Sequence, residues 1–246
     1  MLFRSLNSIG LQGPGIDQFI EDDLKWLEKN QVRTIVSIAG NNAEEFGRIA
    51  GKLRKVGENV VGIEVNISCP NVANRGLVFA CQPESAHEVI SIVRRTIGGS
   101  YPIFAKLSPD VTDIVSIAKA VVDAGASGVS VINTLLGMVI DTQLMKPALA
   151  GVTGGLSGPA IRPVAVRAVW QIRQAFPDLP IIGMGGILSG NDAFEFVLAG
   201  ANAFAIGTAN FHDPSSISRI QSELAQILFE RGFSSLQEAV SFAHRN

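Results

Sequence analysis

Short apolar runs alternate with longer amphipathic segments along most of this chain. The runs predict six buried strands, and they are continuous rather than alternating, as in a parallel sheet covered on both faces. The segments between the runs have a helical period, and several end at glycine. The strands are expected at residues 32–40, 60–68, 102–108, 128–133, 180–186 and 203–208, and helices at residues 16–30, 83–97, 113–125, 161–176, 190–200, 217–232 and 234–245.

Polar residues gather at the points where these strands end. The stretches "NISCPN", "KLSP", "INT", "GMGG" and "GT" all follow a strand directly, and the C-terminal rim of a (β/α)8 barrel holds its active site. We therefore predict an α/β fold of the (β/α)8 TIM-barrel type. Six strands are counted and the chain opens on a loop and a helix, so we expect the first two strands to be missing from one incomplete barrel domain, residues 1–246.

Composition narrows the class of partner. The 246 residues are 47% hydrophobic with a net charge of -2, and the basic residues are scattered, which gives no footprint for nucleic acid or an anionic membrane. Two cysteines, Cys69 and Cys81, and no signal-peptide pattern predict a cytoplasmic protein without a disulfide framework. No apolar run approaches the roughly 20 residues of a membrane span. Small molecules or proteins are the expected partners.

Three glycine-rich stretches and one lysine are candidates for binding an anion. The glycines at residues 154–158, 183–186 and 207 either form tight turns or let backbone N–H groups approach a phosphate, and three such loops favour phosphate. Lys106 lies near the end of an apolar strand, where an ammonium must be paired or used. Its roles include a Schiff-base amine, a phosphate counter-charge, a cation beside an electron-accepting ring, or a side chain that snorkels to water.

Four asparagines and a cysteine complete the set of candidates. Asn7, Asn66, Asn71 and Asn133 lie at strand ends or in a glycine-rich loop, and their amides suit a flat ligand with alternating C=O and N–H groups. Cys69 is either a small buried hydrophobe or a thiolate that acts as base or nucleophile. The residue types alone leave these roles open.

Seven motifs in this order resemble one family, the dihydroorotate dehydrogenases, which are FMN-containing (β/α)8 barrels of pyrimidine synthesis. The resemblance runs from about Asn7 to the final helix. The cysteine in "NISCPN" is similar to the soluble class, since the membrane-associated class carries serine there. The run from residue 132 to 163 is similar to enzymes that pair with an iron–sulfur and FAD subunit and pass electrons to NAD. The motifs are "NSIGLQGPG", "NISCPN", "KLSPDVTDI", "INTLLGMVID", "TGGLSGPAIRPVAVR", "PIIGMGGI" and "GTANFHDP".

The resemblance implies a reaction and a role for each matching residue. Cys69 is implied as the base that takes a proton from C5 of dihydroorotate, while hydride leaves C6 for N5 of FMN and orotate forms. Lys106 is implied beside the flavin ring, where a cation stabilises the reduced form. The substrate residues implied are Asn7, Ser8, Ile9, Gly10, Leu11, Asn66, Asn71, Asn133 and Thr134. The FMN residues implied are Ser37, Asn66, Lys106, Ile132, Gly158, Gly185, Gly186, Gly207 and Thr208.

The sequence departs from the family pattern in two places. Ser37 stands where relatives usually have an asparagine in contact with FMN. Relatives also carry two further strands, one with a second lysine, before the loop that contains Asn7. Two alternatives to the dehydrogenase remain at this stage: a phosphate-binding lyase that uses Lys106 as Schiff-base amine, and a non-catalytic barrel that acts as an interaction subunit. A homo-oligomer or a hetero-oligomer is expected.

Overall fold

A computed structural model describes residues 5–54, 56–68 and 81–245 of the chain. Its contacts divide the chain into two compact units. Unit 1 consists of Met1–Ile9, Ser108–Ile114 and Val131–Asn246, and unit 2 consists of Gly10–Leu107 and Val115–Ser130. The expectation of a single domain stays a prediction.

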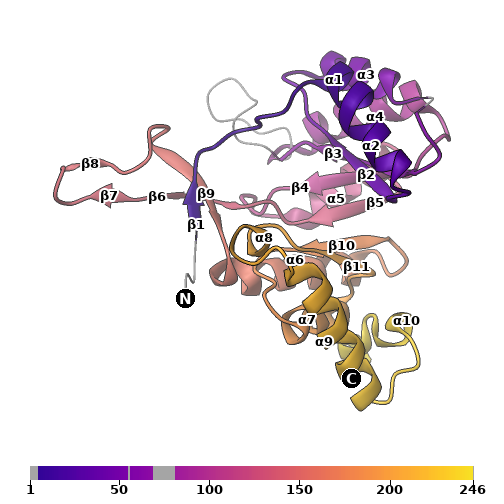
Figure 1. The fold of residues 1–246 in the computed structure, drawn as a ribbon, viewed down its shortest axis with the longest axis vertical. Helices are drawn as coiled ribbons and strands as arrows, with labels where there is room; N and C mark the ends of the chain where they lie inside the picture. The colour runs from indigo at the N-terminus through magenta and orange to yellow at the C-terminus, as the bar shows by residue number, and fades with distance from the viewer. Residues whose placement is uncertain (1–4, 55, 69–80, 246) are drawn as a thin grey trace. The chain divides into compact units, whose positions relative to one another are not determined.

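Unit 2 contains four of the strands that the sequence predicts (Figure 1). They are neighbours in the order β5-β4-β3-β2, and β3 pairs in parallel with both β2 and β4. The strands are β2 (Thr34–Ile38), β3 (Val60–Asn66), β4 (Ile103–Leu107) and β5 (Gly128–Val131). The helices are α1 (Ile16–Gln18), the π-helix η1 (Phe19–Asp23), α2 (Leu24–Lys29), α3 (Ala43–Lys52), α4 (Pro83–Ile97) and α5 (Ile114–Asp123).

Helices α3 and α4 form for local reasons and then pack closely. The Asn42 side chain caps α3 by accepting the N–H of Glu45 at 2.8 Å, which satisfies one of the first unpaired donors of the helix. Helix α4 begins with Pro83 and buries residues 86, 89, 90, 93 and 97, the spacing of one helix face. A side chain at Gly47 would lie 2.6 Å from Ile92 of α4, so the glycine permits the close approach of the two helices.

Unit 1 contains the other two predicted strands, β10 (Ile181–Met184) and β11 (Ala203–Ala205), which pair in parallel. The buried Arg173 guanidinium fixes the C-terminal end of α7 (Gly190–Ala199), because it donates to O of the C-cap residue Gly200 at 3.0 and 2.7 Å. It also donates to Asn202 Oδ1 at 2.8 Å. The helices are η4 (Pro159–Ile161), α6 (Arg162–Ala175), α7 (Gly190–Ala199), α8 (Ala209–His212), α9 (Ser216–Glu230), α10 (Leu236–Ala239) and η5 (Phe242–His244).

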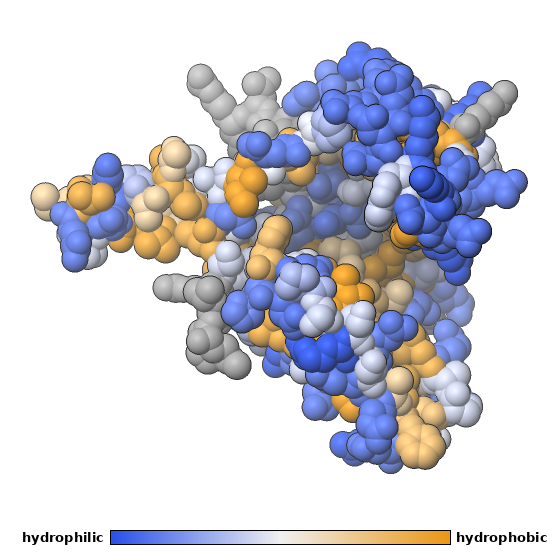
Figure 2. Space-filling view, in the orientation of Figure 1, coloured by the Kyte–Doolittle hydropathy of each residue, from blue (hydrophilic) through white to orange (hydrophobic). Residues whose placement is uncertain are grey.

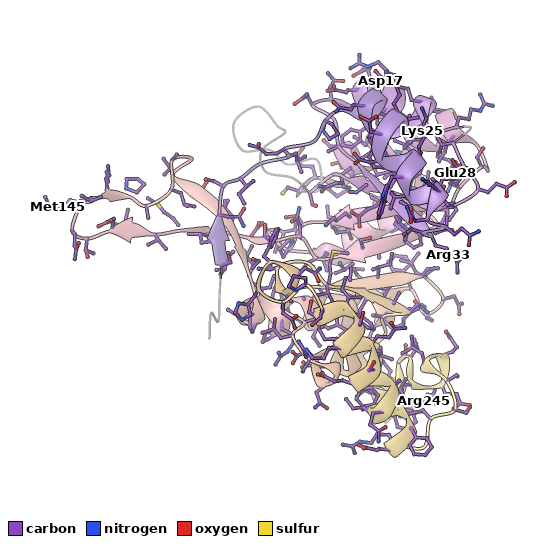
Figure 3. All side chains as sticks on the ribbon, viewed as in Figure 1. Asp17, Lys25, Glu28, Arg33, Met145 and Arg245 are labelled. Carbon is purple, nitrogen blue, oxygen red and sulfur yellow. The ribbon has the colours of Figure 1, made fainter. Side chains whose placement is uncertain are left out.

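Unit 1 also contains an antiparallel ribbon, which Figure 1 draws as a long arm. Strand β9 pairs with β1 on one side and with β6 on the other, and β7 pairs with β8. Figure 2 shows apolar residues along this arm, and Figure 3 labels Met145 at its end, where 86% of the residue is exposed. The strands are β1 (Ser5–Asn7), β6 (Leu135–Met138), β7 (Ile140–Asp141), β8 (Lys146–Pro147) and β9 (Thr153–Ser157).

The α/β class and the six strands expected for the parallel sheet are confirmed, in agreement with a TIM-barrel-type domain. The sequence reasoning missed the ribbon. It assigned the glycines at 154 and 155 to a loop, whereas they lie in strand β9, and it placed Asn7 in a loop, whereas Asn7 ends strand β1. It also missed helix α3. None of the helices in the described part of the chain is long and apolar enough to cross a membrane.

Candidate functional site

Four polar side chains share one face of the β2–β3–β4 sheet in unit 2. Ser37 pairs in register with Glu64, and Asn66 pairs with Lys106. Residues in register on parallel strands point to the same face, as do residues two apart on one strand. Alternate positions such as Ile63, Val65 and Ala105 are fully buried. One face of these strands is therefore apolar, and the other carries the polar cluster Ser37, Glu64, Asn66 and Lys106.

Glu64 is the centre of this polar cluster. The Ser37 hydroxyl donates to Glu64 Oε1 at 2.9 Å, and Lys106 Nζ lies 3.6 Å from the same oxygen. The side chains of Lys106 and Glu64 are 21% and 12% exposed, so the ion pair is largely withdrawn from water. A carboxylate removed from water needs partners of this kind to offset its desolvation.

Two donors of the cluster have no acceptor among the described residues. Asn66 Oδ1 accepts the Ser68 hydroxyl at 2.9 Å, but the Asn66 amide N–H groups donate to no described group. The Lys106 ammonium makes the ion pair with Glu64 and no hydrogen bond to a described residue. An ammonium carries three donors, and these side chains lie where two parallel strands end. The arrangement fits a ligand that presents acceptors, as the C=O groups and ring nitrogens of a flavin do.

A second group of candidates lies in unit 1, around the end of β9. Gly158, Gly185 and Gly186 all have positive φ angles, of 93°, 125° and 76°. A side chain at Gly186 would lie 2.7 Å from Gly158 O, so the two loops touch through bare backbone. The Thr208 hydroxyl donates to the Ser157 hydroxyl at 2.9 Å. These contacts bring Gly158, Gly186 and Thr208 together beside the start of η4, a backbone cradle that fits a phosphate.

The glycines of β9 also bring two of the predicted substrate residues together. Asn7 pairs with Gly155 across the β1–β9 ladder, and a side chain at Gly155 would overlap the Thr134 hydroxyl oxygen. A side chain at Gly154 would overlap Asn7 O. Thr134 N–H donates to Asn133 Oδ1 at 2.8 Å, which fixes the turn after β5.

The remaining predicted residues are placed as follows. Ser8, Ile9, Gly10 and Leu11 are exposed, and Ile132 is buried. Gly207 has open space around its Cα. Cys69 and Asn71 lie outside the described residues. The described candidates thus fall into a set in unit 2 (Gly10, Leu11, Ser37, Asn66, Lys106) and a set in unit 1 (Asn7, Ser8, Ile9, Ile132, Asn133, Thr134, Gly158, Gly185, Gly186, Gly207, Thr208).

Two polar residues of these groups were missed by the sequence reasoning. Glu64 gave a signal, because an acidic residue in the middle of the apolar run "VVGIEVN" is costly to bury without a partner. Ser157 gave none, since a serine next to glycine is an ordinary turn residue. Within the described residues no group of three or more His, Cys, Asp or Glu side chains could hold a metal ion.

Comparison with known proteins gives one consistent result. Residues 3–228 match the family model described as dihydroorotate dehydrogenase. A Geotalea daltonii protein named dihydroorotate dehydrogenase B (NAD(+)), catalytic subunit, is 52% identical over 235 residues, which cover 96% of this chain and 76% of that protein. Proteins of the same name from Desulforamulus reducens and Anoxybacillus flavithermus are 48% and 47% identical over 239 and 241 residues, covering 97% and 98% of this chain and 77% and 76% of their own lengths.

Proposed function

The chain belongs to the dihydroorotate dehydrogenase family of oxidoreductases, and on that premise we propose that it oxidises (S)-dihydroorotate to orotate with FMN in the synthesis of UMP. The family has a role in pyrimidine biosynthesis and is generally flavin-dependent. The observation that carries the proposal is a pair of donors, Asn66 Nδ2 and Lys106 Nζ, in register where β3 and β4 end. Among the described residues Asn66 Nδ2 has no acceptor, and Lys106 Nζ has only the ion pair with Glu64. These donors suit a ligand with acceptors, and a flavin or a pyrimidine has them.

The chain's own residues act on a proton and on the substrate's polar groups. In this proposal the Cys69 thiolate removes the proton from C5 of dihydroorotate, since a thiol near its reference pKa of about 8.5 is a competent base at mildly alkaline pH. FMN, when bound, supplies the acceptor for the hydride that leaves C6. Side-chain amides recognise the ring C=O and N–H groups. The residues proposed for this recognition are Asn7, Ser8, Ile9, Gly10, Leu11, Asn66, Asn71, Asn133 and Thr134.

Two groups of residues would hold the cofactor. In unit 2 the Lys106 ammonium would balance negative charge on the reduced ring. In unit 1 the backbone N–H groups of the glycine loops would bind the phosphate, and the contact of Gly186 with Gly158 supports this because it leaves no side chain in the cradle. The unit 1 residues proposed are Ile132, Gly158, Gly185, Gly186, Gly207 and Thr208.

A partner subunit belongs to the same proposal. The relatives are named catalytic subunits of an NAD-linked enzyme, which supports a hetero-oligomer in which a second subunit removes the electrons. We propose that this subunit carries the iron–sulfur and FAD groups. A cytoplasmic location stays a prediction from the sequence.

The test is an anaerobic titration of the FMN-loaded protein with dihydroorotate. Bleaching of the flavin absorbance near stoichiometric substrate, with release of orotate, supports the proposal. A protein that takes up no flavin but becomes covalently labelled on Lys106 when substrate is trapped with borohydride would instead support the lyase alternative. A protein that does neither but binds a partner would support the non-catalytic alternative.

A further inference from the structure

Glu64 is the buried charge that the proposed reaction does not use. It lies in the middle of β3, is 9% exposed, and has fully buried neighbours in Ile63 and Val65. Its carboxylate has two described partners, Ser37 and Lys106, and both approach the same oxygen, Oε1.

A purely structural role explains this arrangement poorly. The free energy of removing two charges from water exceeds their electrostatic attraction unless further hydrogen bonds satisfy both groups. Proteins in which such a pair is replaced by apolar side chains of similar size are often as stable. Here the ammonium makes no hydrogen bond to a described residue and lies 3.6 Å from the carboxylate. The pair is therefore a poor stabilising device that leaves the lysine donors available.

The geometry points to a different role: we propose that Glu64 is a positioning residue that holds the Lys106 ammonium on the β3–β4 face and sets how strongly it favours reduced over oxidised FMN. The inference rests on the proposed function. Lys106 is one strand away from Glu64 and in register with Asn66, two residues further along β3. A carboxylate at this position pulls the ammonium toward the middle of β3 and opposes part of its field.

The sign of the effect follows from the charges. Reduced flavin carries negative charge, so a nearby cation stabilises the reduced form more than the oxidised form. Glu64→Gln removes the opposing negative charge and keeps a side chain of the same shape that can still accept the Ser37 hydroxyl. At an effective dielectric constant of about 20, a unit charge several ångström away changes such a ratio by about tenfold. For a two-electron couple, tenfold corresponds to a rise of about 30 mV in the midpoint potential.

The chain offers a charge-matched control at the other end of the same strand. Glu58 lies two residues before β3, is exposed, and has no ion pair among the described residues. Glu58→Gln therefore removes the same charge from β3's opposite end. Glu64→Asp keeps the charge but shortens the side chain, and it tests whether charge alone is sufficient.

The first measurement needs no flavin. Urea unfolding is measured for Glu64→Gln, Lys106→Met and the double variant. If the two groups are coupled, each single change lowers the midpoint because it leaves one charge unpaired, and the double variant is more stable than the sum of the two losses predicts. Strict additivity would show that Glu64 does not hold Lys106 and would overturn the inference.

The second measurement is the affinity for oxidised and for chemically reduced FMN, titrated anaerobically at concentrations that also saturate weak binding. The expected result is that Glu64→Gln raises the affinity for reduced relative to oxidised FMN about tenfold, that Glu58→Gln leaves the ratio unchanged, and that Glu64→Asp restores most of the parent ratio. A merely structural role would weaken both affinities equally and leave the ratio constant.

The outcomes separate this inference from the proposed function. A parent protein that reduces FMN with dihydroorotate while Glu64→Gln shows the parent ratio overturns the role of Glu64 alone. A parent protein that binds no FMN in either state overturns the proposed function, and this inference with it.

Discussion

In the glycine cradle of unit 1, substitution of Gly186 should lower stability for two reasons, backbone strain and a steric clash, and a second glycine, Gly232, allows the two contributions to be measured separately. Gly186 has a φ of 76°, and a side chain there would lie 2.7 Å from Gly158 O and 3.1 Å from Arg162 N. Both of these atoms are backbone, so the contact cannot be relieved by a side-chain rotation. Gly232, in the same unit, has a φ of 79° and nothing within 4 Å of the position of a side chain. The two glycines thus have nearly the same φ and differ in their surroundings.

The expected losses of stability follow from that difference. Gly232→Ala costs only the left-handed backbone strain, about 1–2 kcal/mol. Gly186→Ala costs the same strain plus the displacement of the Gly158 loop, which we take as an overpacking cost of about 1–3 kcal/mol. With an m value of about 3 kcal/mol per molar urea, an extra 2 kcal/mol lowers the unfolding midpoint by about 0.7 M relative to Gly232→Ala.

The same pair predicts a difference in binding. A methyl group in the cradle pushes Gly158 away from the position where its loop would meet the phosphate. Loss of one hydrogen bond to a charged group costs about 1.5–3 kcal/mol, so Gly186→Ala should weaken FMN binding by about tenfold or more, whereas Gly232→Ala should leave it unchanged. Urea unfolding and flavin fluorescence titration measure the two effects. Equal midpoints for the two variants would refute the clash, and unchanged FMN affinity in a destabilised Gly186→Ala protein would refute the phosphate role.

Three further predictions concern single side chains. Cys69→Ser should remove most of the flavin reduction by dihydroorotate near neutral pH, because a hydroxyl is a far weaker base than a thiol, and the rate should recover in part at high pH. The control Cys81→Ser should change the rate little. Equal rates for Cys69→Ser and the parent at pH 7 would exclude Cys69 as the base. Desolvation raises the pKa of Asp110 above its ordinary value of 3.8, although a backbone N–H opposes this. The folded state therefore binds the Asp110 proton more tightly than the unfolded state. Because Asp110 is exposed, Asp110→Asn should be only slightly more stable than the parent at pH 7, and in urea unfolding this advantage should vanish as the pH falls below about 3.8; an advantage that does not change with pH would contradict the assignment. Arg173→Gln should cost about 2–4 kcal/mol because backbone carbonyls lose their donor at a residue that is 6% exposed, whereas Arg167→Gln, on the exposed face of the same helix, should cost almost nothing in the same unfolding assay.

The parallel strands could be predicted from the sequence because each is a short, mostly apolar run. The strands expected at residues 60–68 and 102–108 contain β3 (Val60–Asn66) and β4 (Ile103–Leu107). Burial is nearly continuous along β3, as expected for a covered parallel strand, whereas in β4 buried positions alternate with half-buried ones, because its other face carries the polar cluster. Helix α4 could also be predicted from the sequence, because Pro83 marks its start and its buried residues are spaced so that they lie on one face of the helix. These elements have local signals that agree with their tertiary surroundings.

The antiparallel ribbon could not be predicted, because its local signals oppose its structure. Strand β9 reads "TGGLS", and glycine is disfavoured in strands because it has no side chain to pack. The strand exists because Gly154 and Gly155 let β1 and Thr134 approach the backbone at distances that any side chain would prevent. Only the tertiary partner explains the sequence, so a reading of one segment at a time assigned a loop.

In the polar cluster of unit 2, Ser37 has a different role from the one that its position in the sequence suggests. From the sequence, Ser37 stands where relatives usually have an asparagine in contact with FMN. In the structure its hydroxyl donates to Glu64 Oε1 at 2.9 Å. A serine has one proton to donate, whereas an asparagine amide has two. With that proton committed to Glu64, Ser37 can offer a ligand only a hydroxyl lone pair or its backbone. The polar contribution of this face to a bound flavin then rests on the donors of Asn66 and Lys106, and the position of Lys106 depends in turn on the carboxylate that Ser37 helps to hold.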